Sequence, residues 1–240
     1  MLILGFQKTT LLDYPGKLAS IVFTGGCNLF CPYCQNSELA FNFDPDKTAP
    51  VSEDEVLEHL KKRRGMIEGL VITGGEPTLQ KDLPSFIRKV RSLELLIKLD
   101  TNGTNPSLLK ELLDEGLLDY VAMDIKQSID NYPAACGLPA GGNTDSLLER
   151  VKEAINILLS CGIDYEFRTT VVRELFKKED LPKLASMIKG AKSYYLQGFQ
   201  KSPGVPEDCS FSAPSPEEMA EYEKIMKTLL PGTFVSLRGI

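Results

Sequence analysis

Three cysteines stand close together in the sequence and have the chemistry to bind metal. Cys27, Cys31 and Cys34 follow the spacing C-x3-C-x2-C, and no fourth cysteine is nearby. Cysteine-ligated iron–sulfur clusters usually have four thiolate ligands. Three thiolates can hold three irons of a cubane cluster and leave the fourth iron open to a ligand that is not protein. The motif therefore predicts a reactive cluster rather than a passive electron carrier.

Other residues with chemical potential stand where predicted strands end. In a parallel sheet wound with helices, the loops that follow the strands lie on one face. The candidates from the second strand onward are Gly74, Gly75 and Glu76, then Asp100, then Asp124 and Lys126, then Arg168, and finally Gln197. Together with the three cysteines they predict a site on that face.

Each candidate also has a purely structural interpretation. Gly74 and Gly75 suit an ordinary turn, or they let the backbone approach a ligand closely. Asp100 and Asp124 could simply end their strands. Lys126 and Arg168 need partners if they are buried, either a ligand carboxylate or ion pairs within the protein.

The remaining cysteines and the single histidine give weaker signals. Cys136, Cys161 and Cys209 have no paired spacing, so we expect buried or incidental thiols. His59 stands at an amphipathic-helix position, where we expect a surface side chain. Because the only histidine is expected at the surface, the sequence argues against a Ser-His-Asp triad as the catalytic device.

Apolar runs alternate with helical periods along almost the whole chain. The predicted strands are Leu18–Thr24, Leu70–Thr73, Leu95–Asp100, Tyr120–Ile125, Tyr165–Val172, Tyr194–Gln197 and Thr233–Leu237. The predicted helices begin at capping boxes at Ser52 and Ser215, or cover Leu83–Ser92, Ser107–Glu115, Leu147–Cys161 and Asp180–Lys189.

This alternation predicts an α/β fold with parallel strands, because parallel neighbours need a crossover connection. The length of 240 residues favours a single domain, with a hairpin-like segment over 1–17 and a core over 18–240. Three longer loops interrupt the alternation of strands and helices and are candidates for functional segments. They are Glu38–Pro50, Gln127–Asp145 and Phe199–Pro214.

Composition narrows the classes of function. A net charge of -6 and a pI near 5.1 argue against nucleic-acid binding, which relies on clustered basic charge. No apolar run reaches the ~20 residues of a membrane helix, and no signal-peptide pattern is present. We therefore expect a cytoplasmic protein, where thiols stay reduced and a cysteine cluster indicates metal binding.

The motifs together resemble the radical S-adenosylmethionine (SAM) enzymes, whose fold is a partial (β/α)6 TIM-like barrel. The resemblance rests on the cysteine spacing, with Tyr33 before the last cysteine, and on Gly-Gly-Glu-Pro one strand later. Within that superfamily the chain looks like the activating enzymes of glycyl radical enzymes, especially the longer anaerobic ribonucleoside-triphosphate reductase activating group. The segments that carry this narrower likeness are Asp13-Tyr14-Pro15-Gly16, Asp100-Thr101-Asn102-Gly103 and Met123-Asp124-Ile125-Lys126-Gln127.

The resemblance implies a [4Fe–4S] cluster on the three cysteines, with SAM at its open iron. Flavodoxin or ferredoxin would supply an electron, and SAM cleavage would yield a 5′-deoxyadenosyl radical that takes hydrogen from a glycine of the partner. The implied SAM contacts are Tyr33, Gly74, Gly75, Glu76, Lys126, Arg168 and Gln197. Asp100 and Asp124 would line the same mouth and hold a monovalent cation, and Asp13 would contact the partner's glycine loop.

The sequence departs from the pyruvate formate-lyase activator, a more distant relative, at Tyr14 and Gln197, and it lacks a ferredoxin-like insertion. Two other readings stay open. A radical SAM enzyme acting on a small molecule, as in 7-carboxy-7-deazaguanine synthase, would use the Gln127–Asp145 loop as a lid. A structural zinc site would need a fourth protein ligand, and no Cys or His is at hand to supply one.

Overall fold

The computed structural model describes residues 1–44, 48–138, 144–202, 204–206 and 209–239. The chain divides into two compact units, which are described one at a time. Unit 1 contains residues 1–28, 36–101 and 107–121. Unit 2 contains residues 29–35, 102–106 and 122–240.

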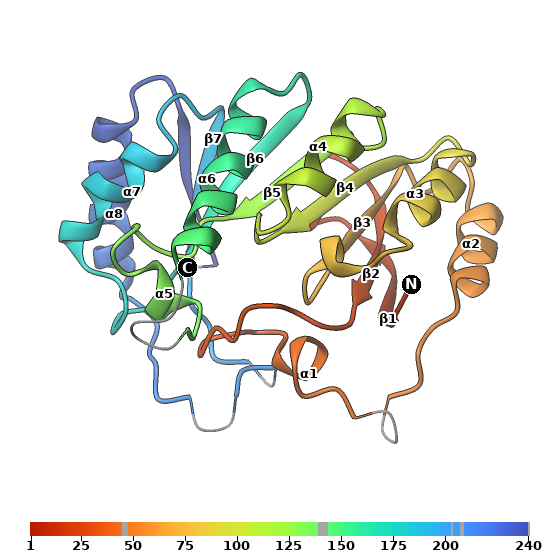
Figure 1. The fold of residues 1–240 in the computed structure, drawn as a ribbon, viewed down its shortest axis with the longest axis horizontal. Helices are drawn as coiled ribbons and strands as arrows, with labels where there is room; N and C mark the ends of the chain where they lie inside the picture. The colour runs from red at the N-terminus through yellow and green to blue at the C-terminus, as the bar shows by residue number, and fades with distance from the viewer. Residues whose placement is uncertain (45–47, 139–143, 203, 207–208, 240) are drawn as a thin grey trace. The chain divides into compact units, whose positions relative to one another are not determined.

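Unit 1 is built on four strands that lie side by side in chain order (Figure 1). They are β1 (Ile3–Thr10), β2 (Ala19–Thr24), β3 (Gly69–Gly74) and β4 (Leu96–Thr101). β1 pairs antiparallel with β2, whereas β2, β3 and β4 are parallel, with Ala19 opposite Gly69 and Gly69 opposite Leu96. The helical segments are α1 (Ser37–Ala40), α2 (Glu53–Lys62), the 3-10 turn η1 (Pro77–Leu79), α3 (Leu83–Arg91) and, except for its first residue, α4 (Pro106–Asp114).

Unit 2 is built on three parallel strands in chain order, β6 (Asp164–Val171), β7 (Ser193–Gly198) and β8 (Phe234–Arg238). Helix α8 packs on β7 and β8, and α7 packs on α8 (Figure 1). The helical segments are α5 (Tyr132–Ala135), α6 (Asp145–Ser160), the 3-10 turn η2 (Lys178–Asp180), α7 (Leu181–Met187) and α8 (Pro216–Leu229). The strand β5 (Tyr120–Asp124) begins in unit 1 and ends in unit 2.

Two helices begin where their capping residues stand. The Ser52 hydroxyl accepts from the Glu55 amide at 3.1 Å and starts α2. At α8, Ser215 and Glu218 form a reciprocal capping box, with bonds of 3.2 and 2.6 Å. Because these bonds satisfy amides that have no partner inside a helix, they fix the first turn.

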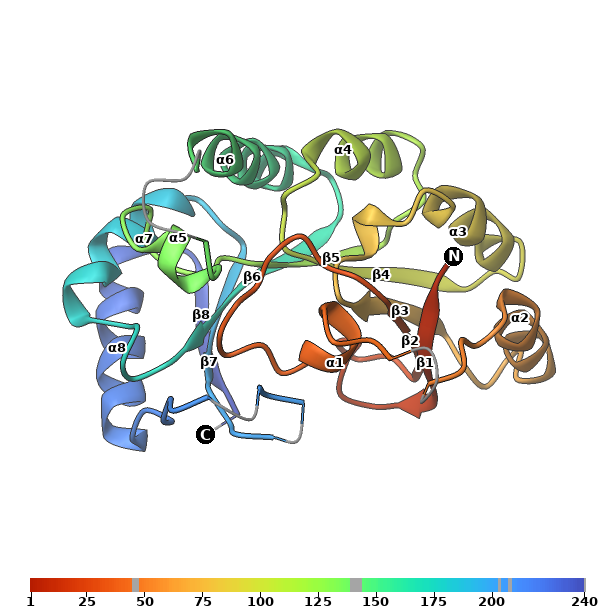
Figure 2. The same cartoon turned by 60° about the horizontal axis from the view of Figure 1, so that its bottom comes forward.

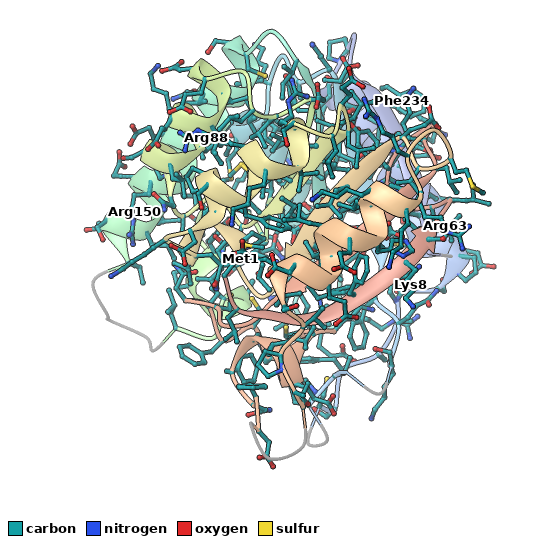
Figure 3. All side chains as sticks on the ribbon, turned by 90° about the vertical axis from the view of Figure 1, so that its right-hand side faces the viewer. Met1, Lys8, Arg63, Arg88, Arg150 and Phe234 are labelled. Atoms are coloured by element: carbon teal, nitrogen blue, oxygen red, sulfur yellow. The ribbon has the colours of Figure 1, made fainter. Side chains whose placement is uncertain are left out.

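The core of unit 1 gathers around an aromatic residue that precedes β2. Tyr14 is buried with Ala19, Ile21 and Val71, and the Tyr120 ring lies 6.0 Å from its ring. Charged side chains such as Lys8, Arg63 and Arg88 are exposed on the exterior of this unit (Figure 3). In unit 1, these apolar residues are therefore buried and these charged residues exposed, as the pattern of apolar and charged residues in the sequence predicts.

Every predicted strand and helix is present, with bounds within two residues of those expected. The α/β class with parallel strands is confirmed. The prediction of one domain over 1–240 stays a prediction. None of the helices in the described ranges combines the length and apolar character of a membrane-crossing segment.

Three features differ from the sequence prediction. β1 is a full strand over Ile3–Thr10 that the sequence analysis did not predict, and it pairs antiparallel with β2; α1 begins one residue before a predicted loop, and α5 lies inside another. His59 is only partly exposed and packs edge-on against Phe6 at 5.2 Å, so the surface expectation was wrong. Residues 45–47, 139–143, 203 and 207–208 of the three predicted loops lie outside the described residues.

Candidate functional site

The first part of the cysteine loop is anchored in unit 1 by its backbone. The Gly26 amide donates to the Leu39 carbonyl at 2.9 Å, and the Gly26 carbonyl accepts from the Glu76 amide at 2.8 Å. The backbone of Gly26 is left-handed, with φ of +86°. Cys27 follows directly and is partly exposed. The loop after β2 is therefore fixed between α1 and the end of β3.

Gly74 and Gly75 are required by this close approach of two backbones. A Cβ on Gly75 would lie 1.9 Å from the Gly26 oxygen, and one on Gly74 would lie 2.3 Å from the Thr24 nitrogen. Gly74 also has φ of +121°. Any larger residue would push the cysteine loop away from β3. The close approach of the two backbones explains why both positions need glycine, which could not be deduced from the sequence alone.

Glu76 joins the ends of β3 and β4. The side chain is 1% exposed, and its Oε1 accepts from the Thr78 amide at 3.1 Å and the Thr78 hydroxyl at 2.6 Å. The same oxygen accepts from the Thr101 hydroxyl at 2.7 Å. The Glu76 carboxylate therefore caps η1 and ties the loop after β3 to the end of β4.

Asp100 and Asp13 also have partners within unit 1. Lys98, which is 2% exposed, forms an ion pair with Asp100 near the carboxyl end of β4. Asp13 is exposed in the turn between β1 and β2 and accepts from the Thr10 hydroxyl.

The second part of the cysteine loop lies in unit 2, beside α5 (Figures 1 and 2). The Phe30 amide donates to the Cys136 carbonyl at 3.0 Å, and the Cys34 amide donates to the Cys31 carbonyl at 3.0 Å. Gly137 has φ of +68°, and a Cβ there would lie 2.0 Å from the Phe30 oxygen. The turn that carries Cys31 and Cys34 is thus packed tightly against the end of α5.

Cys31 lies in surroundings that favour its thiolate. A side-chain hydrogen bond from Cys136 lowers the pKa of Cys31 to about 7, and the positive charge of Lys126 acts in the same direction, although burial opposes both. The thiolate is the form of cysteine that binds metal. The sequence predicted Cys136 to be a buried or incidental thiol, and it is buried, but its distance of 105 positions from Cys31 gave no signal of the contact.

Tyr33 carries a buried hydroxyl that no hydrogen bond satisfies among the residues that the structure describes. The side chain is 5% exposed. Burial, followed by the negative charge of Cys31, raises the pKa of Tyr33 well above its ordinary value. A buried polar atom without a partner is costly. The Tyr33 hydroxyl is therefore available to a bound ligand.

Charged side chains of alternating sign lie next to one another at the end of β5 and just after it, on β6 and on β8. Asp124 pairs with Lys126 at 2.9 Å and with Arg168 at 3.0 Å. Glu166, which is 1% exposed, lies 4.0 Å from Arg168 and receives two bonds from Arg238, at 2.6 and 2.8 Å. Ion pairs thus satisfy Lys126 and Arg168, one of the two alternatives in the sequence prediction. Neither Glu166 nor Arg238 was predicted.

The electrostatics of Asp124 and Lys126 follow from this pairing. Burial would raise the pKa of Asp124, but Lys126 and Arg168 outweigh it and lower the value to about 2. Burial would lower the pKa of Lys126, but Asp124 and then Cys31 hold it well above its ordinary value. Both groups are charged at neutral pH, and Lys126 supplies positive potential at Cys31.

Each unit brings part of the predicted set together. Unit 1 places Gly74, Gly75 and Glu76 against Gly26, and unit 2 groups Cys31 and Tyr33 with Lys126 and Asp124. Gln197 is half-buried at the end of β7, in register with Thr170 and Arg238. In the described ranges, no three Cys, His, Asp or Glu side chains are gathered closely enough to hold a metal ion.

The donors nevertheless fit an iron–sulfur cluster in chemical type. They are thiols, one of them is stabilised as thiolate, and a cation and an unsatisfied tyrosine hydroxyl adjoin it. Hard-metal sites would instead need several oxygen ligands.

Comparison with known proteins gives three findings. A sequence profile described as the Radical SAM superfamily matches residues 21–188. A protein of Methanocaldococcus jannaschii that carries the provisional name glycyl-radical enzyme activating enzyme is 30% identical over 236 residues, 98% of this chain and 95% of that protein. The 7-carboxy-7-deazaguanine synthase of Thermococcus kodakarensis is 28% identical over 202 residues, 76% of this chain and 74% of that protein.

A solved structure supports the fold. The radical SAM methyltransferase from Sphaerobacter thermophilus superposes with a TM-score of 0.70 at 15% identity, covering 96% of this chain and 68% of that one. At this identity the likeness concerns the fold alone. It agrees with the predicted partial barrel of parallel strands.

Proposed function

The chain belongs to the radical SAM superfamily, and we propose that within it the protein activates a glycyl radical enzyme. Membership implies a [4Fe–4S] cluster and SAM as cofactors. When bound, they supply reductive cleavage of SAM and a carbon radical able to abstract hydrogen. The protein's part is to bind, orient and shield them.

In this proposal Cys27, Cys31 and Cys34 hold the cluster, and residues at the strand ends hold SAM. Because the Glu76 carboxylate already accepts three bonds, the Gly74–Glu76 edge would face SAM with its backbone. The Tyr33 hydroxyl would gain the partner that it lacks within the described residues. The other proposed SAM-site residues are Asp100, Asp124, Lys126, Arg168 and Gln197.

The likeness to the Methanocaldococcus protein carries this proposal, because it extends over 98% of this chain and 95% of that protein. The proposed partner is an anaerobic ribonucleotide reductase, and the proposed electron donor is flavodoxin or ferredoxin. Asp13 stays a candidate contact for the partner, since it is exposed at the turn between β1 and β2.

The experiment is an anaerobic activation assay. The reconstituted protein is mixed with a reductant, SAM and a candidate anaerobic reductase, and the glycyl radical is sought by electron paramagnetic resonance. We expect a radical doublet on the partner and one 5′-deoxyadenosine per radical formed.

Controls separate the chemistry from the partner. Cys31→Ala should abolish 5′-deoxyadenosine formation, whereas Cys161→Ala, at a thiol outside the motif, should retain it. The similarity to the deazaguanine synthase makes a small-molecule substrate the second candidate. Turnover of a pterin without any protein partner, and no radical on candidate reductases, would favour that second function.

A further inference from the structure

Lys98 is a lysine of unit 1 whose charged side chain is buried. It stands on β4, is 2% exposed and is in register with Val71 of β3. Val71 belongs to the buried cluster around Tyr14. The Lys98 ammonium lies 5.9 Å from the centre of the Tyr120 ring, which is a cation–π contact. Because lysine is almost never fully buried unless its charge is paired, a partner of opposite charge is required here.

Asp100 is that partner. Side chains two positions apart on a strand share one face, and the Lys98 ammonium donates to the Asp100 carboxylate in an ion pair. The Asp100 side chain is 15% exposed, so the pair meets solvent at the carboxylate rather than at the ammonium. Salt therefore screens this pair less than it screens a pair on the surface.

The likeness to the activating enzymes implies a monovalent cation at Asp100 and Asp124. A Na⁺ or K⁺ ion bound to Asp100 would lie close to the Lys98 ammonium, and two positive charges repel strongly where water is scarce. In unit 2, Asp124 pairs with Lys126 at 2.9 Å and with Arg168 at 3.0 Å. Within each unit, the carboxylate is neutralised by side chains of the protein and does not fit a bound monovalent cation.

We propose that the Lys98 ammonium is an internal counter-ion that neutralises and positions Asp100, so that the protein binds SAM without a monovalent cation. Lys98 is then a positioning residue that acts through Asp100. The inference rests on the proposed function, because it requires that Asp100 belong to the SAM site. It gives a role to a residue that lies outside the sequence motifs.

Two other roles for Lys98 make different predictions. A lysine that only supports the fold would, when replaced, weaken SAM binding equally in every salt. A metal ion that acts together with Lys98 would make SAM binding by wild type depend on Na⁺ or K⁺. An internal counter-ion instead makes wild type indifferent to the cation, and dependence on the cation arises only when the ammonium is removed.

The test measures SAM binding to the anaerobically reconstituted full chain by equilibrium dialysis. The buffers contain KCl, NaCl or N-methylglucamine chloride at equal ionic strength, because N-methylglucamine is too bulky to replace a metal ion beside a carboxylate. Wild type should have the same Kd in all three. Lys98→Met keeps an unbranched side chain without the charge, and should bind SAM about tenfold more weakly in N-methylglucamine chloride, since a charged partner is lost. K⁺ or Na⁺ should recover most of that loss.

The matched control is Lys110→Met. Lys110 lies in the same unit and pairs with Asp114 on the surface of α4, so this variant should match wild type in every buffer. A wild-type Kd that rises when K⁺ and Na⁺ are removed would overturn the proposal. So would a folded Lys98→Met that binds SAM as tightly as wild type, or equally weakly in all three buffers.

If Lys98→Met does not fold, wild type and the double variant Lys98→Met with Asp100→Asn decide. The double variant lacks both charges, so K⁺ or Na⁺ dependence of either protein would overturn the proposal.

A second measurement needs no SAM and no cluster. Sodium NMR relaxation should be faster with the cluster-free Lys98→Met than with wild type or Lys110→Met, and excess K⁺ should reverse the difference. Equal relaxation with the three proteins would contradict the role of Lys98. A wild type that binds SAM in none of the buffers would instead refute the proposed function.

Discussion

Asp124 holds two cations with one carboxylate. Its two oxygens pair separately with Lys126 and Arg168, and the second of these adjoins the buried Glu166. This arrangement keeps two positive side chains together, Lys126 just after β5 and Arg168 on β6, despite their mutual repulsion. Removal of the carboxylate would leave that repulsion uncompensated.

The pH dependence of stability should report this pairing. The folded pKa of Asp124, about 2, is below its ordinary value of 3.8, so its contribution is fully present above pH 4. It is lost as the pH falls from about 4 to about 2. We expect the difference in unfolding free energy between wild type and Asp124→Asn, from urea denaturation, to be constant at pH 5–7 and to shrink below pH 4. A difference that persists at pH 2 would contradict the pairing.

For single residues, the sequence predicted which side chains belong to the candidate site but not which partners they contact. Lys126 and Arg168 stood out because charged residues in apolar strands need partners. Glu166 and Arg238 are 72 positions apart in sequence, and their bidentate pair depends on the register of β6, β7 and β8. Cys136 likewise comes to lie next to Phe30 of the cysteine loop only when α5 forms. Such contacts follow from tertiary structure, which no local pattern encodes.

At the scale of elements, the end of β3 illustrates how a turn can constrain a neighbouring loop. Gly74 and Gly75 bring β3 against Thr24 and Gly26 with no space for a side chain. The Gly75 amide also donates to the Thr24 carbonyl at 2.9 Å. The position of the cysteine loop in unit 1 therefore depends on two glycines, one at the end of β3 and one directly after it.

Substitution at this turn should be costly. We expect Gly75→Ala to lower the free energy of unfolding by ~1–3 kcal/mol, because its methyl group would overlap the Gly26 oxygen. The matched control is Gly162→Ala, where a Cβ meets nothing within 4 Å and the change should stay within about 0.5 kcal/mol. Thermal and urea unfolding measure both. Equal stabilities of the two variants would show that the contact relaxes without cost.

Secondary structure was the most predictable level, because apolar periodicity and caps are local signals. The Ser215 capping box and the strand over Leu70–Thr73 appear almost as expected. The strand β1 was missed because Phe6-Gln7-Lys8-Thr9 lacks a continuous apolar run, and antiparallel pairing with β2 stabilises it instead. The short helices α1 and α5 are too brief to give a periodic pattern.

At the scale of the whole molecule, the fold follows from the order of its elements. Strand–helix alternation requires parallel pairing, and the likeness to a solved radical SAM structure at 15% identity agrees with that inference. The overall charge is also set by composition, with 27 basic residues against 33 acidic ones.

Because of this net negative charge, we expect the protein not to bind nucleic acid. We expect no saturable binding to a fluorescent DNA duplex at micromolar protein and 150 mM salt, measured by anisotropy, since phosphate binding relies on released counterions at basic surfaces. A lysine-rich peptide is the positive control. Salt-sensitive binding tighter than about 10⁻⁶ M would show that a local basic surface outweighs the net charge.

The strands pair in chain order, so each parallel ladder spans a single crossover connection, and the length of that connection bears on how fast the protein folds. Ala19 meets Gly69 and Gly69 meets Leu96 in unit 1, while Phe167 meets Tyr194 and Ser193 meets Phe234 in unit 2. The entropy of closing such loops changes by only about 0.6 kcal/mol for each doubling of their length. The paired residues are 50, 27, 27 and 41 positions apart, so each crossover must close before its parallel ladder forms, and we expect slower folding than for a helical protein of this length.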